Sequence, residues 1–212
     1  MAVTLQTPKE AGPFSTWLGE IRGTLKEGKD AEVPRQSCTA CCTSFQFIHI
    51  EPDEIGTLKA IPKQLLFDAP GAPAGYRVMG YTAVGHCPMF IESKCSIYEN
   101  RPRTCRSYDC RIYSATDTAI DDPNRTEISK IVKSWQFSYE SETDQKSKDQ
   151  ISLALNFIDA HNLDFNYPID NSPTLRALIA IEISNLFLSR KIEDQTVDKI
   201  QAVNLQLKSY IG

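Results

Sequence analysis

Two stretches of this chain concentrate its cysteines: Cys38-Thr39-Ala40-Cys41-Cys42, and a later run that contains Cys95-Ser96-Ile97-Tyr98-Glu99-Asn100-Arg101-Pro102-Arg103-Thr104-Cys105. The seven cysteines are Cys38, Cys41, Cys42, Cys87, Cys95, Cys105 and Cys110. The long remainder from Arg111 to Gly212 has none. Inert core thiols would be scattered along the chain, so the clustering indicates that these thiols act together and organise the region that contains them.

The redox compartment decides how the cysteines are interpreted. At 212 residues the chain can bury a core without cross-links, and an odd number of thiols cannot all pair within one chain. No basic segment followed by an apolar one opens the sequence, and the longest wholly apolar run is Ala177 to Ile181, so we expect no signal peptide, no membrane association and a cytoplasmic location. Because cytosolic thiols are kept reduced, metal ligation is the first explanation for the cluster. Buried, inert thiols are the alternative.

Charge excludes one class of partner. The chain has 23 basic and 27 acidic side chains, and the resulting net charge of −4 argues against a general nucleic-acid binder. No glycine-rich phosphate loop, dinucleotide fingerprint or serine-histidine-acid arrangement is recognisable, so the sequence leaves open whether the protein is an enzyme.

Apolar periodicity predicts a mostly α fold. Helices are expected over Pro13–Glu27, Glu51–Ile61, Arg103–Tyr108, Lys148–His161, Pro173–Arg190 and Glu193–Tyr210. Short strands are expected over Ser44–Ile50 and in a hairpin of Met89–Ile91 with Cys95–Ile97, and a loop over Pro62–Gly75. The resulting organisation is a leader and helix (1–33), an irregular cysteine-cluster metal-binding region with a few short strands (34–113), and a helical C-terminal region (114–212) packed on it as one compact unit.

Spacing suggests how the thiols meet. The C-x2-C pair of Cys38 and Cys41 can turn two sulfurs toward one ion, and a hairpin can bring Cys87 and Cys95 together. On an ideal helix Cys105 and Cys110 would point about 140° apart, so the helix must break near Tyr108 if both bind the same metal. We predict that Cys38 or Cys41 shares a centre with members of the Cys87–Cys110 group.

A longer pattern is similar to a known family. Cys38-x2-Cys41-Cys42, then Cys87-Pro88-Met89-Phe90, then Cys95-Ser96-Ile97-Tyr98-x2-Arg101-Pro102-x2-Cys105-Arg106-x-Tyr108-x-Cys110 resembles the YkgJ-type cysteine-cluster family, a zinc- or iron-chelating domain, over Pro34 to Arg111. The family opens with C-x2-C-x2-C-C, and this chain has Arg35 in place of the first cysteine. The resemblance implies metal binding. One relative, the flagellin lysine methylase, connects it with iron–sulfur-assisted protein modification.

Other side chains near the cysteines have two interpretations each. His86 could complete a mixed Cys/His site or lie in a solvated loop, and His49 and His161 are expected to be structural. Five basic residues could neutralise thiolates or donate hydrogen bonds to sulfur, with a phosphate or nucleic-acid patch as the alternative: Lys94, Arg101, Arg103, Arg106 and Arg111. The acidic Glu51, Asp53 and Glu54 are expected to open a helix rather than form a carboxylate site.

Two functional hypotheses follow. In the first, the thiolates hold an iron–sulfur cluster or another metal that supports modification of a partner protein. In the second, zinc only stabilises an interaction module, and the helical C-terminal half docks a partner without catalysis. Seven thiols exceed the four ligands of one zinc ion or one cluster, which favours two centres or leaves spare thiols.

Overall fold

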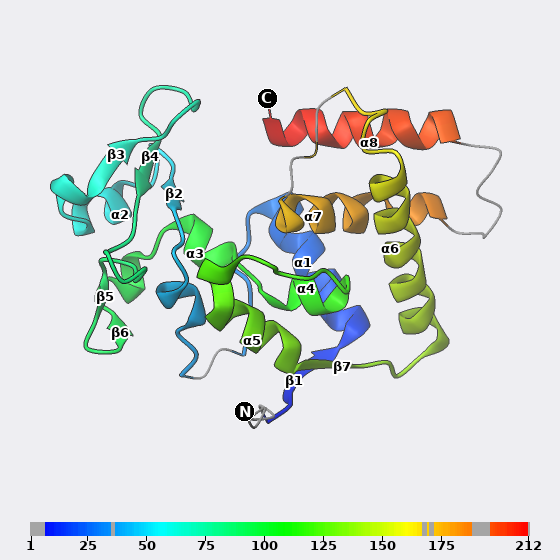
Figure 1. Cartoon of the computed structure of the whole chain (residues 1–212), viewed down its shortest axis with the longest axis horizontal. Helices are drawn as coiled ribbons and strands as arrows, with labels where there is room; N and C mark the ends of the chain where they lie inside the picture. Colours follow the sequence, from blue (N-terminus) through cyan, green and yellow to red (C-terminus); the bar gives the residue numbers. More distant parts are fainter. Residues whose placement is uncertain (1–6, 35–36, 167–168, 170–171, 188–195, 212) are drawn as a thin grey trace. The chain divides into compact units, whose positions relative to one another are not determined.

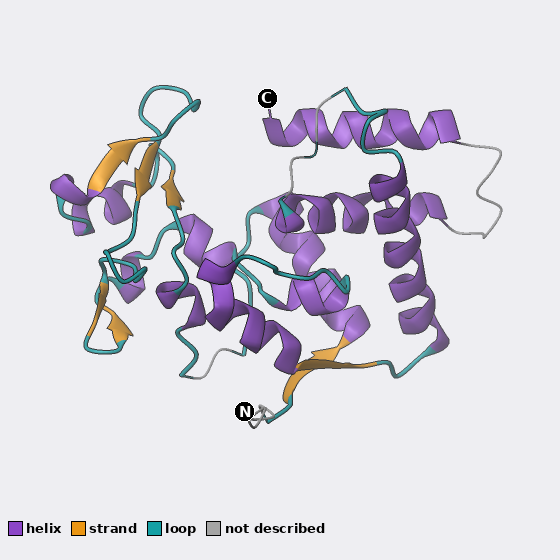
Figure 2. Ribbon diagram, viewed as in Figure 1, coloured by secondary structure: helices purple, strands orange, loops and turns teal. Residues whose placement is uncertain are grey.

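The computed structural model describes residues 7–34, 37–166, 169, 172–187 and 196–211, with the side chains of 209–211 excepted. Helices dominate and the strands are few and short, so the predicted mostly α fold is confirmed (Figures 1 and 2). The chain divides into two compact units. Unit 1 contains Met1–Arg22, Cys110–Ile120 and Val132–Gly212, and unit 2 contains Gly23–Asp109 and Asp121–Ile131.

Unit 1 is a helical body with one small parallel strand pair. Its elements are β1 (Lys9–Pro13), most of α1 (Phe14–Glu27), α4 (Arg111–Ala115), the end of α5 (Thr126–Ser134), β7 (Trp135–Ser138), α6 (Glu142–Ala160), α7 (Pro173–Ile183), the 3-10 turn η5 (Ser184–Phe187) and α8 (Thr196–Ile211). Helix α7 contacts α4, α6 and α8. Its Ala177, Ile179, Ala180 and Ile181 are all fully buried. These contacts and this burial make α7 the central helix of the unit. A helix that is buried on most sides needs apolar residues all round, and α7 has them.

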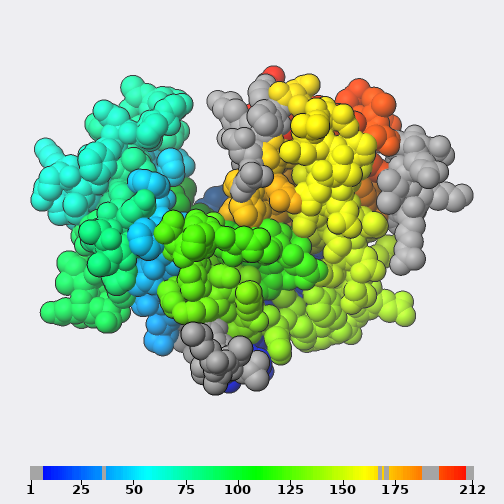
Figure 3. Space-filling view, viewed as in Figure 1, coloured from blue at the N-terminus to red at the C-terminus, as the bar shows by residue number. Residues whose placement is uncertain are grey.

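Unit 2 is built from short helices and strands that are separated by loops. They are η1 (Ala40–Thr43), β2 (Ile48–Ile50), α2 (Ile55–Ala60), η2 (Lys63–Leu65), β3 (Leu66–Asp68), β4 (Arg77–Met79), β5 (Phe90–Ile91), β6 (Lys94–Cys95), η3 (Tyr98–Asn100), α3 (Arg103–Ser107), η4 (Pro123–Arg125) and the greater part of α5. The side chains of residues 45–100, cyan to green, pack as one continuous mass in the space-filling view (Figure 3).

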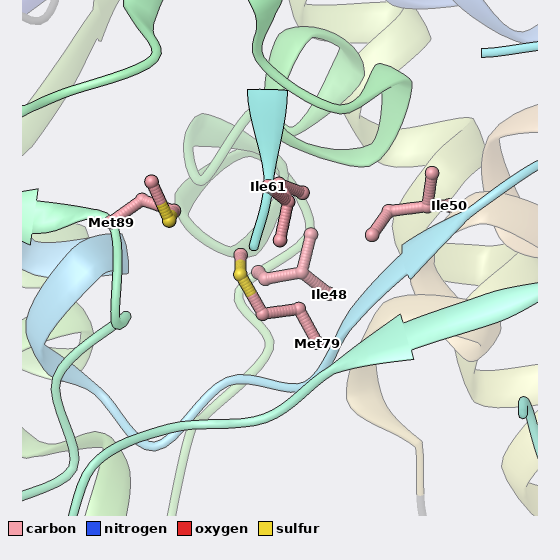
Figure 4. Packing of buried hydrophobic residues seen from close by; sticks show 5 residues of the cluster. All are labelled: Ile48, Ile50, Ile61, Met79 and Met89. Atoms are coloured by element: carbon pink, nitrogen blue, oxygen red, sulfur yellow. The ribbon is translucent and has the colours of Figure 1, made fainter. Parts of the chain in front are cut away.

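A small antiparallel sheet carries the core of unit 2. Strand β4 lies between β2 and β3, with Ile48 and Leu66 both opposite Met79. Five buried side chains form the core cluster: Ile48, Ile50, Ile61, Met79 and Met89 (Figure 4). The partly buried Cys87 and Cys105 pack against this cluster. The core is small, so few apolar contacts fix the positions of the thiols around it.

Several element boundaries differ from the sequence predictions. The expected loop over Pro62–Gly75 contains η2 and β3, because Leu66–Asp68 pairs with β4. The expected strand over Ser44–Ile50 shortens to β2, and the helix expected from Glu51 begins only at Ile55.

The C-terminal helices also differ in their limits. Helix α6 begins six residues before Lys148, at Glu142, with a Ser141–Asp144 capping box. Helix α7 ends at Ile183, and its predicted end at Arg190 lies outside the described residues. Helix α8 begins at Thr196, and its predicted start at Glu193 lies outside them as well. None of the described helices is long and apolar enough to cross a bilayer.

Candidate metal centre

Unit 2 contains six of the seven cysteines, and they come from separate segments. Cys41 and Cys42 lie in η1, Cys95 ends β6 and Cys105 lies in α3. Cys87 follows a tight turn in which Thr82 N–H donates to the His86 carbonyl at 2.8 Å. Every cysteine is half-buried and none forms a disulfide. The thiols are therefore brought together by folding and not by cross-linking.

Two backbone hydrogen bonds join the first cysteine group to Cys87. Cys87 N–H donates to the Cys42 carbonyl at 2.8 Å, and Phe45 N–H donates to the Gly85 carbonyl at 2.9 Å. Phe45 has a positive φ of 49°, which is rare for a bulky residue, and its ring lies against the α-carbon of Gly85. This strained contact and the two hydrogen bonds bring the backbones of Cys42 and Cys87, 45 positions apart in the sequence, next to each other.

The turn after Cys87 provides hydrogen-bond donors to its sulfur. Burial raises the pKa of the Cys87 thiol, and the Cys95 and Cys41 thiols raise it further. The backbone N–H groups of Met89 and Phe90 act in the opposite direction, because they hydrogen-bond to the sulfur and stabilise its thiolate. Such donors around a sulfur are typical of the surroundings of metal-bound cysteine.

The hairpin and the short helix bring in two more thiols. Cys95 pairs with Phe90 across the β5–β6 hairpin, whose turn residues Glu92 and Ser93 have positive φ angles. Helix α3 places Cys105 against the core cluster that Cys87 also contacts. The helix ends at Ser107 and Tyr108 is extended, so the break near Tyr108 is present.

The electrostatic interactions connect five of these thiols. The Cys42 thiol shares a hydrogen bond with that of Cys41, and this bond, burial and the Cys41, Cys87 and Cys105 thiols all raise the pKa of Cys42. Together with the Cys87–Cys95 interaction, they define the five-thiol cluster: Cys41, Cys42, Cys87, Cys95 and Cys105. Within the described ranges, no three His, Cys, Asp or Glu side chains are arranged as ligands around one ion. Metal binding would therefore require the sulfurs to move together.

The other two cysteines have different surroundings. Cys38 lies just before η1 in unit 2. Cys110 belongs to unit 1, precedes α4 and accepts a hydrogen bond from Trp135 Nε1 at 3.3 Å. Arg35, which replaces a family cysteine, lies outside the described residues.

The three histidines have other contacts. His86 packs edge-on against the Phe90 ring, and His49 is exposed on β2. His161 Nδ1 lies 2.7 Å from Asp164 at the end of α6.

The four arginines expected around the thiols contact other groups. Arg106 binds Asp30, Arg111 binds Glu20, and the Arg101 guanidinium stacks 3.5 Å from the centre of the Tyr98 ring. Arg103 binds the carboxylates of Glu51 and Asp53. These acidic residues therefore do more than open a helix, because they hold the segment that carries Cys105. Sequence reasoning missed this link, since nothing local in the sequence pairs residues 50 and 52 positions apart.

The comparisons identify the family. A family described as a "putative zinc- or iron-chelating domain", CxxCxxCC, matches residues 35–143, about half of the chain. The match extends past the last cysteine into α6, and so includes residues of both units. No curated protein and no solved structure matches the chain. The chain belongs to the CxxCxxCC zinc- or iron-chelating family.

Proposed function

We propose that this protein binds zinc or iron through the five-thiol cluster, and that the metal organises unit 2. The observation that carries the proposal is that thiols from η1, the Cys87 turn, the β5–β6 hairpin and α3 interact with one another, with Cys87 and Cys105 packed against one small core. Family membership supports metal binding in general terms.

The chemistry of the donor set fits such a metal. Thiolates are ligands for zinc and for iron–sulfur clusters, and all the interacting groups are sulfurs. Neighbouring thiols raise the pKa of Cys42 and of Cys87 because thiolates repel one another, and a bound cation would remove that repulsion. The metal would supply a Lewis-acidic or electron-transferring centre. The chain's own residues would bind it, donate hydrogen bonds from Met89 and Phe90 to Cys87, and partly exclude water.

We favour iron–sulfur chemistry that supports modification of a partner protein in the cytoplasm. The support is the similarity to the family that includes the flagellin lysine methylase, together with a surplus of thiols over the four that one cluster needs. The ligand spacing is also longer and less regular than in compact zinc fingers. Cys38 in unit 2 and Cys110 in unit 1 are each proposed as a spare thiol or as a ligand of a further centre within its own unit.

The test is metal and acid-labile sulfide analysis of protein purified without oxygen. Wild-type protein should contain zinc or iron in stoichiometric amount, and a brown colour with labile sulfide would identify an iron–sulfur cluster. Cys87→Ser should lose most of the metal, because it removes the sulfur that accepts hydrogen bonds from the backbone N–H groups of Met89 and Phe90. Ser96→Ala, a nearby control whose hydroxyl donates only to the Met89 carbonyl, should retain it. Metal-free wild-type protein, or full retention in Cys87→Ser, would contradict the proposal.

A structural zinc module is the second candidate, and exposed apolar side chains of unit 2 favour it. Phe47 is 59% exposed and Val84 67% exposed, and the Phe47 and Phe45 rings both contact Tyr81. Exposed apolar side chains that gather in one place are typical of a surface that docks a partner. A colourless protein that contains zinc and no labile sulfide would select this function over the first.

A further inference from the structure

The carboxylate of Glu54 has an unusual position for an acidic side chain. It is 7% exposed, although its neighbours in the Glu51–Glu54 segment are at the surface of unit 2. Oε1 accepts a hydrogen bond from the Glu51 N–H at 2.9 Å, and Oε2 accepts one from the Arg103 N–H at 2.5 Å. A buried carboxylate is costly unless both oxygens are satisfied, and here two backbone donors satisfy them.

This carboxylate joins the start of α2 to the start of α3. Thr104 Oγ1 adds a hydrogen bond to the His49 carbonyl at 2.7 Å, so two consecutive residues of α3 are attached to β2 and to the segment that follows it. The next residue is Cys105, whose side chain packs against the core cluster beside Cys87. The orientation of α3, and with it the place of the Cys105 sulfur, therefore depends on these bonds.

We propose that Glu54 is the positioning residue that holds the Cys105 thiol within the five-thiol cluster. This inference rests on the proposed function for its consequence in metal binding, and on hydrogen-bond geometry for the position of Cys105. Glu54 touches no sulfur in this role. It acts through the Arg103 backbone, whereas Asp53 and Glu51 reach Arg103 only through its guanidinium.

That difference provides a matched pair of variants. In Glu54→Gln one carboxylate oxygen becomes an NH2 group, which cannot accept a hydrogen bond. It would face either the Glu51 N–H or the Arg103 N–H, so one of the two buried hydrogen bonds is lost. Asp53→Asn weakens an ion pair whose carboxylate is 65% exposed and leaves the backbone bond intact. Thr104→Val removes only the bond to the His49 carbonyl and provides a milder perturbation of the same helix.

The first readout needs no metal. Reduced, metal-free full-length protein is alkylated with iodoacetamide under native conditions, and each cysteine is followed by peptide mass. Because a lost bond to a buried charge shifts local opening by about tenfold or more, Cys105 in Glu54→Gln should react about tenfold faster than in wild type. Cys110 in unit 1 should be unchanged, Asp53→Asn should stay within about twofold, and Thr104→Val should fall between.

The second readout is the cobalt(II) spectrum of the same proteins. Glu54→Gln should show a weaker thiolate-to-cobalt band, consistent with one lost sulfur, and Asp53→Asn should match wild type. If Glu54→Gln loses its circular dichroism spectrum, Glu54→Asp replaces it in the alkylation of Cys105, because the shorter side chain keeps its carboxylate but moves it away from the Arg103 N–H. Equal Cys105 rates in Glu54→Gln, Thr104→Val and Asp53→Asn would overturn the inference. A wild-type protein without a thiolate band would refute the proposed function, while the alkylation rates would still decide the role of Glu54.

Discussion

Replacement of Gly85 by alanine should separate the two cysteine groups. A methyl group at Gly85 would lie 2.2, 2.3 and 2.4 Å from three carbons of the Phe45 ring, and Gly85 has a φ of +80°. Phe45 cannot simply retreat, because its N–H bonds the Gly85 carbonyl and its ring contacts Tyr81. Relief of the clash should therefore break the two backbone hydrogen bonds, Phe45 to Gly85 and Cys87 to Cys42, that hold Cys42 beside Cys87.

Gly71→Ala is the matched control. Gly71 lies in the same unit with a φ of +74°, but nothing lies within 4 Å of the added methyl group. Both variants place a side chain in the left-handed region, at a cost of about 1–2 kcal/mol. Only Gly85→Ala adds overpacking, at a further cost of about 1–3 kcal/mol.

The assay is amide hydrogen exchange at Cys87 in reduced, metal-free protein, since this amide donates to the Cys42 carbonyl. The extra cost should speed exchange in Gly85→Ala by about tenfold to a hundredfold over Gly71→Ala, because about 1.4 kcal/mol corresponds to a factor of ten. Similar exchange rates in the two variants would refute the account of how Cys42 and Cys87 are held together.

Three further predictions concern the two units. Hydrogen bonds from Ser15, Ser141 and Glu140 lower the pKa of Asp144, so its contribution to stability should be complete above about pH 4 and be lost as pH falls further. The variant Asp144→Asn should remove this acid dependence from urea unfolding curves. Arg111→Met should destabilise unit 1 by about 2 kcal/mol, because it removes a buried partner of Glu20, whereas the exposed control Lys130→Met should cost under about 0.5 kcal/mol. Metal-free protein should be cut by trypsin faster than metal-loaded protein between residues 38 and 110, with little change in α6–α8, and equal rates would show that metal does not organise this region.

Sequence patterns within a few residues of one another predicted the helices and the hairpin. Period-3.6 apolar patterns found α1, α6, α7 and α8, and the polar residues between Ile91 and Cys95 marked the hairpin. The start of α6 was missed because its first turns are wholly polar, although Ser141 and Asp144 form a capping box that could have indicated it. The parallel β1–β7 pair joins residues more than 120 positions apart, and no nearby residue indicates it.

For the candidate site, too, the sequence predicted the residues but not how distant ones are arranged. Clustering and spacing identified all seven cysteines as candidates, but not which of them meet. Their arrangement depends on contacts between distant residues, such as the Phe45 ring on Gly85 and the Glu54 carboxylate on Arg103. Positive φ at a phenylalanine and burial of a glutamate in an acidic segment both oppose ordinary propensity, so sequence reasoning could not anticipate them.

X-ray absorption at the metal edge of anaerobically purified full-length protein tests the central claim most directly. The account predicts sulfur scatterers at about 2.3 Å from the metal, four for each zinc ion or iron atom. Around zinc they would be thiolates of the five-thiol cluster, and around iron these thiolates together with inorganic sulfide. In Cys105→Ser the number of sulfur scatterers, or the metal content, should fall. A first shell of oxygen and nitrogen alone, unchanged by Cys105→Ser, would contradict it.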